Sequence, residues 1–104
     1  MNDDALTVSL AQRVMGWSIA PDRFLMGSRR WIPRWRFQPT ENLADAFRLL
    51  EEAAPQEFSM CGDSQCNFQV RVRIGDGTGE SDETSKPRAI TFAIARAVGI
   101  QIEP

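Results

Sequence analysis

The chain has 104 residues with 42% apolar and 25% charged side chains, and its twelve basic and fourteen acidic residues leave a net charge of −2. This balance predicts one folded domain with its own core, and it excludes a disordered chain. No apolar run approaches the ~20 residues that a membrane span needs, and no histidine is present for Ser/His or Cys/His catalysis. We therefore expect a cytoplasmic protein without membrane contact that is not an enzyme and holds neither a metal nor a cofactor.

The N-terminal part of the chain predicts a helix followed by a short hairpin. Apolar residues recur at helical spacing between residues 4 and 15, and Gly16 is suited to end the helix in a left-handed conformation. Residues 17–26 read WSIAPDRFLM, in which Pro21-Asp22 separates two apolar runs. Proline and aspartate are common turn residues, so the two runs are expected to pair as antiparallel strands.

A second helix is expected to begin with Thr40 as its N-cap. Leu43, Phe47 and Leu50 recur at i, i+4 and i+7, which predicts that they form the buried face of this helix. Pro55 cannot continue a helix, so the helix is expected to end before it.

The clearest pattern in the chain is the alternation of apolar and polar side chains over residues 66–74. Such alternation predicts a strand with one buried face and one polar face. Residues 57–61 are expected to pair with it in the antiparallel sense, through a turn at residues 62–65.

The register of this hairpin decides whether the two cysteines can pair. Pairing Met60 with Cys66 and Phe58 with Phe68 places all four side chains on the core face. A shift of one residue would turn the apolar side chains to solvent, so burial selects this register. Cys61 then points away from Cys66, and no disulfide is expected.

Residues 75–86 read GDGTGESDETSK and contain three glycines, four acids and no large apolar side chain. This composition predicts a solvated, mobile loop. Its acids lack the spacing of a calcium-binding loop, and no Gly-Lys-Ser/Thr follows the glycines to make a phosphate-binding loop. A third helix is expected after it, capped by Thr84 or Ser85, with Pro87 in its first turn. Gly99 is suited to end this helix.

The basic segment SRRWIPRWRF, residues 28–37, is the place where the sequence points to a binding surface. Between Arg23 and Phe37 there are five arginines and no acid, a charge of +5 against −7 for the rest of the chain. Pro33 argues against a central strand, so an irregular crossing or an edge strand is expected here.

Two interpretations of this segment stay open. In the structural one, Trp31, Trp35 and Phe37 enter the core, and replacing either tryptophan by alanine destabilises the fold by ~3–5 kcal/mol. In the functional one, arginine and tryptophan form a contact surface for a protein partner, for a second copy of the chain, or for single-stranded nucleic acid. The candidate binding residues are Arg29, Arg30, Trp31, Arg34, Trp35 and Arg36.

Three further segments, taken together in their order and spacing, follow the pattern of a protein family. LAQRVMGW ends the first expected helix, PTENLADAF begins the second, and RAITFAIARAVG forms the third. Val14-Met15-Gly16-Trp17 and Ala44-Asp45-Ala46-Phe47 in particular resemble the phage ABA sandwich family, small proteins encoded by bacteriophages and prophages. The resemblance implies an α+β fold over residues 1–104, an α-β-α sandwich with three helices and a mainly antiparallel sheet of about 3–5 strands. The alternative is a two-layer α/β arrangement with one solvated sheet face, which the polar side of residues 66–74 favours.

The function of that family is not established, so the resemblance adds no catalytic, cofactor-binding or metal-binding residues. The expected function is that of a small phage- or prophage-derived protein that is not an enzyme and acts by binding a partner protein. The negative charge of the whole chain opposes long-range attraction to nucleic acid. Single-stranded nucleic-acid binding through residues 29–37 therefore stands as the alternative.

Overall fold

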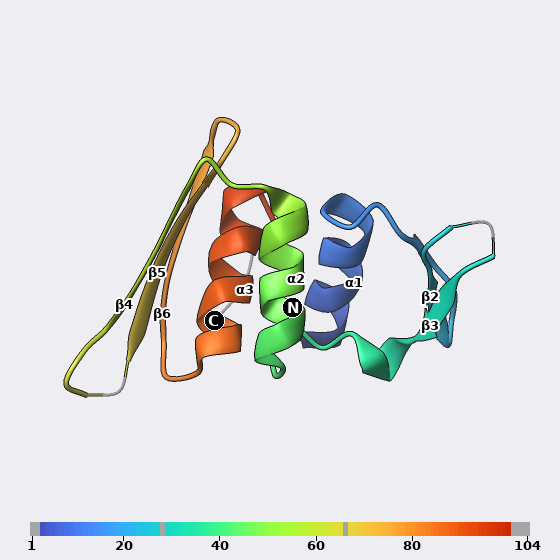
Figure 1. Cartoon of the computed structure of the whole chain (residues 1–104), viewed down its shortest axis with the longest axis horizontal. Coiled ribbons are helices and arrows are strands. Elements are labelled where there is room, and N and C mark those ends of the chain that lie inside the picture. The colour runs from blue at the N-terminus through green and yellow to red at the C-terminus, as the bar shows by residue number, and fades with distance from the viewer. Residues whose placement is uncertain (1–2, 28, 66, 101–104) are drawn as a thin grey trace.

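The computed structural model describes residues 3–27, 29–65 and 67–100 (Figure 1). Within them the chain forms three α-helices, one short 3₁₀ helix and six strands. In chain order these are α1 (Asp3–Arg13), β1 (Ser18–Ile19), β2 (Arg23–Leu25), β3 (Trp31–Pro33), the 3₁₀ helix η1 (Arg34–Arg36), α2 (Leu43–Ala53), β4 (Glu57–Gly62), β5 (Phe68–Ile74), β6 (Gly77–Glu83) and α3 (Lys86–Ala97).

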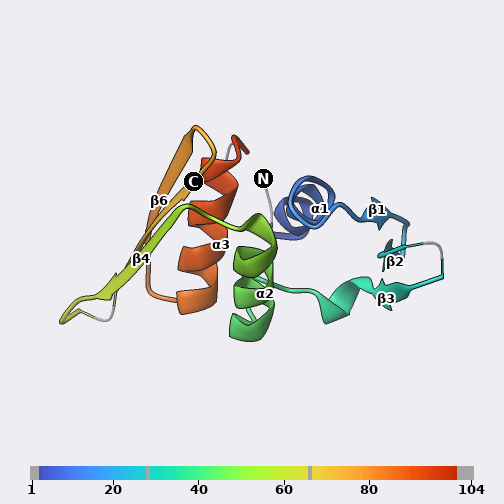
Figure 2. The ribbon, with the colours of Figure 1, turned by 45° about the horizontal axis from the view of Figure 1, so that its top comes forward.

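The helices lie between two small antiparallel sheets (Figure 1, Figure 2). The sheet β4-β5-β6 forms one end of the molecule, α3 packs on its inner face, α2 packs on α3, and the sheet β1-β2-β3 lies at the other end beyond α1. The expected α+β sandwich with three helices and antiparallel strands is confirmed. In the described part of the chain no helix covers the outer face of β4-β5-β6, so this sheet has the solvated face that the two-layer alternative expected.

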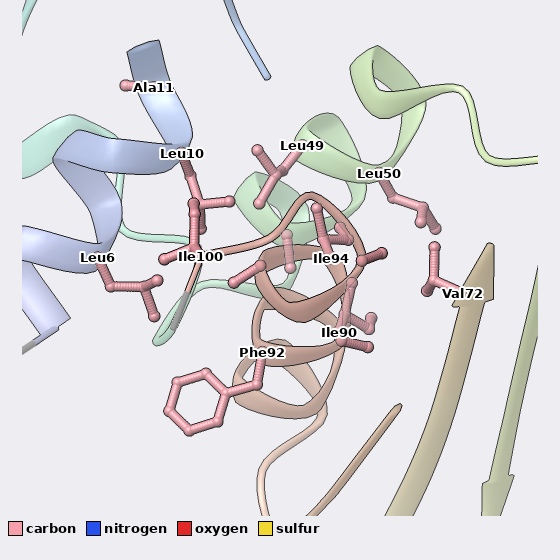
Figure 3. Close-up of a cluster of buried hydrophobic side chains, with 14 of the residues drawn as sticks. Leu6, Leu10, Ala11, Leu49, Leu50, Val72, Ile90, Phe92, Ile94 and Ile100 are labelled. Carbon is pink, nitrogen blue, oxygen red and sulfur yellow. The ribbon is translucent and has the colours of Figure 1, made fainter. Parts of the chain in front are cut away.

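Helix α3 is the centre of the hydrophobic core. Its predicted ends are confirmed, because the Ser85 side chain accepts a hydrogen bond from the Arg88 amide and Gly99 follows the helix with a φ of +85°. Side chains are buried on nearly every side of this helix, since β5 and β6 pack on one side and α2 on another. Figure 3 shows the surrounding apolar side chains, among them Leu6 and Leu10 of α1, Leu49 and Leu50 of α2, Val72 of β5, and Ile90, Phe92 and Ile94 of α3 itself.

The prediction of a loop over residues 75–86 is wrong, because most of this segment forms strand β6. A tight turn at Gly75, which has a φ of +59°, brings the strand back along β5. Gly77 and Gly79 face α3, and a Cβ atom at Gly79 would overlap the backbone of Ala93 and Ala97. The glycines therefore let α3 lie unusually close to the sheet, which is a tertiary requirement and not a sign of a loop.

The predicted register of β4 against β5 is wrong in its pairs and right in its faces. Phe58 pairs with Val72 and Met60 with Val70, four residues further along the chain than expected. A shift by an even number of residues keeps the same side chains on the inner face, so burial alone did not distinguish the two registers. Burial fixes the face of a strand, whereas the turn fixes its pairs.

The turn between β4 and β5 is wider than the sequence suggested. The Asp63 carboxylate accepts hydrogen bonds from the amides of Gln65 and Asn67, at 2.8 and 3.0 Å, and so holds a larger loop together. Cys66, which the expected register paired with Met60, lies outside the described residues. Cys61 is exposed as a free thiol on the outer face of the sheet.

Helix α2 begins later than predicted. Asn42, not Thr40, is its N-cap, and its side chain accepts a hydrogen bond from the Asp45 amide at 3.1 Å. Leu43 and Phe47, expected in the core, are 37% and 38% exposed. The prediction is right for Leu50, which is buried. The helix is rotated from the predicted face toward the side of Ala46 and Leu49, where the small alanine permits close packing on α3. The buried stripe consists of Ala46, Leu49 and Leu50.

Candidate functional site

The small sheet β1-β2-β3 carries the basic segment. The expected hairpin is confirmed by the antiparallel pairing of β1 with β2, and β3 lies at the edge of the sheet as Pro33 predicted. Alternation along the strands separates two faces. Phe24 and Ile32 pair on the inner face, and Leu25 and Trp31 pair on the outer face.

Three aromatic rings fill the space beneath the inner face. Trp17, Phe24 and Phe37 are all buried, and their ring centroids are 5.0 to 5.9 Å apart in tilted and edge-to-face contacts. The structural interpretation of the basic segment is therefore right for Phe37. It is wrong for Trp31 and Trp35, which are 52% and 67% exposed, because the other three rings already occupy this part of the core.

The outer face presents an apolar pair with a cation held over it. Leu25 is 38% exposed beside Trp31, and the guanidinium carbon of Arg23 lies 4.4 Å from the centroid of the Trp31 ring. Asp22 fixes this guanidinium through two hydrogen bonds, at 3.0 and 2.9 Å. These hydrogen bonds lower the pKa of the Asp22 carboxyl below its ordinary value and raise the pKa of Arg23. We call Arg23, Leu25 and Trp31 the outer-face cluster.

Trp35 belongs to a different element, the 3₁₀ helix η1. It lines a groove of about 340 Å³ beside the start of α1, and the guanidinium carbon of Arg36 lies 5.5 Å from its ring centroid. Three carboxylates, those of Asp3, Asp4 and Glu41, also line this groove. Asp4 pairs with Arg34, which also lines the groove, and Asp3 pairs with Arg88. The groove thus combines an exposed aromatic ring with two ion pairs and the carboxylate of Glu41.

The six residues predicted for the binding surface do not all serve as free contact groups. Arg34 is held in place, because it forms a salt bridge with Asp4 at 3.0 Å and donates to the Pro21 carbonyl at 3.2 Å. Arg29 and Arg30 are exposed on the connection between β2 and β3. The sequence interpretation missed two members of the outer-face cluster, Arg23 and Leu25. The pairing of β2 with β3 brings them beside Trp31, and the predicted hairpin, which joined β1 to β2, did not include this pairing.

A second hollow lies over the outer face of β4-β5-β6. It has a volume of about 480 Å³, and its lining includes Ser59, Cys61 and the ion pair of Arg71 with Glu80, whose atoms are 3.5 Å apart. Among the described residues, no group of three or more His, Cys, Asp or Glu side chains is placed to hold a metal ion. None of the described helices is long and apolar enough to cross a membrane.

The family resemblance seen in the sequence is confirmed. In fold the chain is similar to a phage protein from Bacillus cereus ATCC 14579, with a TM-score of 0.78 and 18% sequence identity over 99% of this chain and 93% of that one. No curated protein matches the sequence. The match to the phage ABA sandwich domain covers residues 9–94, which include both sheets, α2 and most of α3. The chain therefore belongs to the phage ABA sandwich domain family.

Proposed function

We propose that this phage domain acts by binding a partner protein, and that the outer-face cluster is the centre of the contact. The observation that carries the proposal is the exposed pair of Leu25 and Trp31 with Arg23 over the ring. Tryptophan and arginine are the residues on which the binding energy of protein interfaces concentrates. Covering the pair removes apolar surface from water, which is the main gain in most protein associations.

The cluster is also ordered before it binds. The two hydrogen bonds from Arg23 to Asp22 hold the guanidinium over Trp31, and pairing of β2 with β3 holds Leu25 beside the ring. A partner therefore meets side chains that have already lost much of their freedom, and less entropy is lost on binding.

Single-stranded nucleic acid fits this end of the molecule less well. Two of the five arginines are neutralised, Arg23 by Asp22 and Arg34 by Asp4. In the groove around Trp35, Asp3 and Asp4 already pair with Arg88 and Arg34, so those two arginines are not free to bind a phosphate, and the Glu41 carboxylate would repel one. The cations left for phosphates are those of Arg29, Arg30 and Arg36, and they keep nucleic-acid binding through residues 29–37 as the alternative.

Affinity capture from phage-infected cells tests the contact surface. The tagged protein is compared with Trp31→Ala and with Phe47→Ala, which removes a ring of comparable exposure from α2. We expect a protein that is retained by the wild type and by Phe47→Ala and is lost with Trp31→Ala. Capture that is the same for all three forms would contradict the proposal.

Fluorescence titration with a mixed-sequence single-stranded oligonucleotide tests the alternative. Exposed Trp31 and Trp35 report on any base that stacks on them, and a phosphate-driven contact weakens steeply between about 50 and 200 mM salt. We expect no change in emission at either salt concentration. Quenching that fades at the higher concentration would establish nucleic-acid binding instead.

A further inference from the structure

The two edge strands of the sheet β4-β5-β6 differ in whether their outward backbone groups have partners. At β6 the Glu80 carbonyl, which faces away from β5, accepts a hydrogen bond from the Arg96 guanidinium at 2.6 Å, and α3 packs along this strand. Strand β4 is the outermost strand on the side of the sheet away from α3 (Figure 1). Within the described residues no side chain or strand pairs with its outer edge.

The alternation of the antiparallel ladder shows which groups of β4 face outward. The Asp63 amide donates to the Asn67 carbonyl at 3.0 Å, so this residue is bonded toward β5. Every second residue of β4 repeats that arrangement, and the residues between them direct N–H and C=O away from β5. The residues whose backbone faces outward are Phe58, Met60 and Gly62.

The inner face of β4 is also incompletely covered. Helix α3 packs on β5 and β6, and the side chains of β4 lie beyond it. Phe58 is 39% exposed and Met60 is partly exposed, although their cross-strand partners Val72 and Val70 are buried. The strand thus leaves both backbone hydrogen-bonding groups and apolar side chains without a complete set of contacts.

Features that normally prevent edge pairing are missing from this strand. Its sequence EFSMCG has no lysine, arginine or proline and only one charge, at Glu57. The edges of the small sheet differ, because β3 contains Pro33 and β1 is two residues long. Among the strand edges that the structure describes, β4 is the long, unprotected one.

We propose that β4 pairs with β4 of a second copy in an antiparallel, two-fold symmetric dimer that joins the two sheets into one of six strands. A second copy has the same unprotected edge, so the outward N–H and C=O groups of the two β4 strands can form hydrogen bonds with each other. With Ser59 on the two-fold axis, each Phe58 lies opposite Met60 of the other copy, and Glu57 lies opposite Cys61. No like charges then face each other, whereas the register with Met60 on the axis places Glu57 opposite Asp63. The register with Phe58 on the axis would place the polar Gln56 opposite Met60 and lose the pairing of Phe58 with Met60.

The substitution Ser59→Glu tests this dimer. In the monomer Ser59 is exposed and lies opposite Arg71, so the new carboxylate has a favourable partner. In the dimer two carboxylates face each other across the axis, and we expect dimerisation to weaken about a hundredfold. Thr78→Glu is the matched control, because Thr78 is exposed on β6 and lies opposite Arg73, away from the proposed interface.

Sedimentation velocity over a range of micromolar concentrations gives the dissociation constant of each form. Dimers of the wild type and of Thr78→Glu, with a monomeric Ser59→Glu, support the proposal. A wild type that stays monomeric throughout, or a dimer that Ser59→Glu leaves intact, overturns it. Circular dichroism shows that the variants are folded.

Hydrogen exchange of the wild type gives a second measurement that needs no variant. In the monomer the outward amides of Phe58 and Met60 exchange quickly, and in the dimer they become protected as the concentration rises. Protection that does not change with concentration overturns the proposal. Neither measurement involves the outer-face cluster, so the dimer and the proposed partner binding can fail separately.

Discussion

The two sheets of this protein each have a buried face and an open face, and the open faces differ. On β4-β5-β6 the open face is polar and carries cross-strand pairs such as Arg71 with Glu80. On β1-β2-β3 the open face carries Leu25 and Trp31. A polar face is stable in water, whereas an exposed apolar pair gains free energy when another surface covers it. The smaller sheet is thus the one whose open face is suited to contact.

The buried faces of the two sheets differ as well, because α3 lies directly against the backbone of β6 in the larger sheet. The prediction with the largest expected effect tests this close packing. Because a Cβ atom at Gly79 would overlap the backbone of α3, Gly79→Ala is expected to lower the free energy of unfolding by about 3 kcal/mol or more. Urea denaturation measures the change. Gly27→Ala, beside the small sheet, is the control, since no described atom lies within 4 Å of its new Cβ, and its effect is expected to stay within about 0.5 kcal/mol. Equal stability of both variants would contradict the close packing of α3 on β6.

The same glycines show what the sequence could and could not predict. Helix α3, its cap at Ser85 and its end at Gly99 follow from local signals, and the structure has them where expected. Strand β6 has no such signal, because Gly77 and Gly79 are needed by a helix that follows later in the chain. Local composition therefore indicated a loop where tertiary packing requires a strand.

The candidate site shows the same difference between features with a local signal and features set by tertiary packing. Turn residues predicted the hairpin of β1 with β2, and Pro33 predicted an irregular crossing or an edge strand, which is the strand that carries Trp31. The number of aromatic rings that the core can hold is a property of the whole fold, so the sequence did not show that Trp31 and Trp35 would be exposed. The salt bridge from Arg34 to Asp4 joins residues 30 positions apart and has no local signature either.

A pair of alanine substitutions sharpens the contrast between the faces of the small sheet. Phe24→Ala removes a buried ring that contacts Trp17 and Phe37, and it is expected to cost about 3–5 kcal/mol of unfolding free energy. Trp31→Ala, on the opposite face of the same sheet, is expected to cost less than about 1 kcal/mol, because its ring is half exposed. Thermal or urea unfolding of both variants measures the difference. A loss of several kcal/mol for Trp31→Ala would mean that this ring stabilises the core, and the contact surface would then lose its central residue.

The smallest effect concerns the ion pair that orders the outer-face cluster. The hydrogen bonds from Arg23 lower the pKa of Asp22 from its ordinary value of 3.8, so the ion pair persists above that value and is lost as the pH falls through the lowered pKa. Titration of the Asp22 carboxyl carbon by NMR is expected to show a midpoint below 3.8, and Arg23→Gln is expected to move the midpoint back toward that value. A midpoint of 3.8 or higher in the wild type would mean that the guanidinium is not fixed in solution. The surface over Trp31 would then have to order itself on binding, and its affinity for a partner would be lower by that entropy cost.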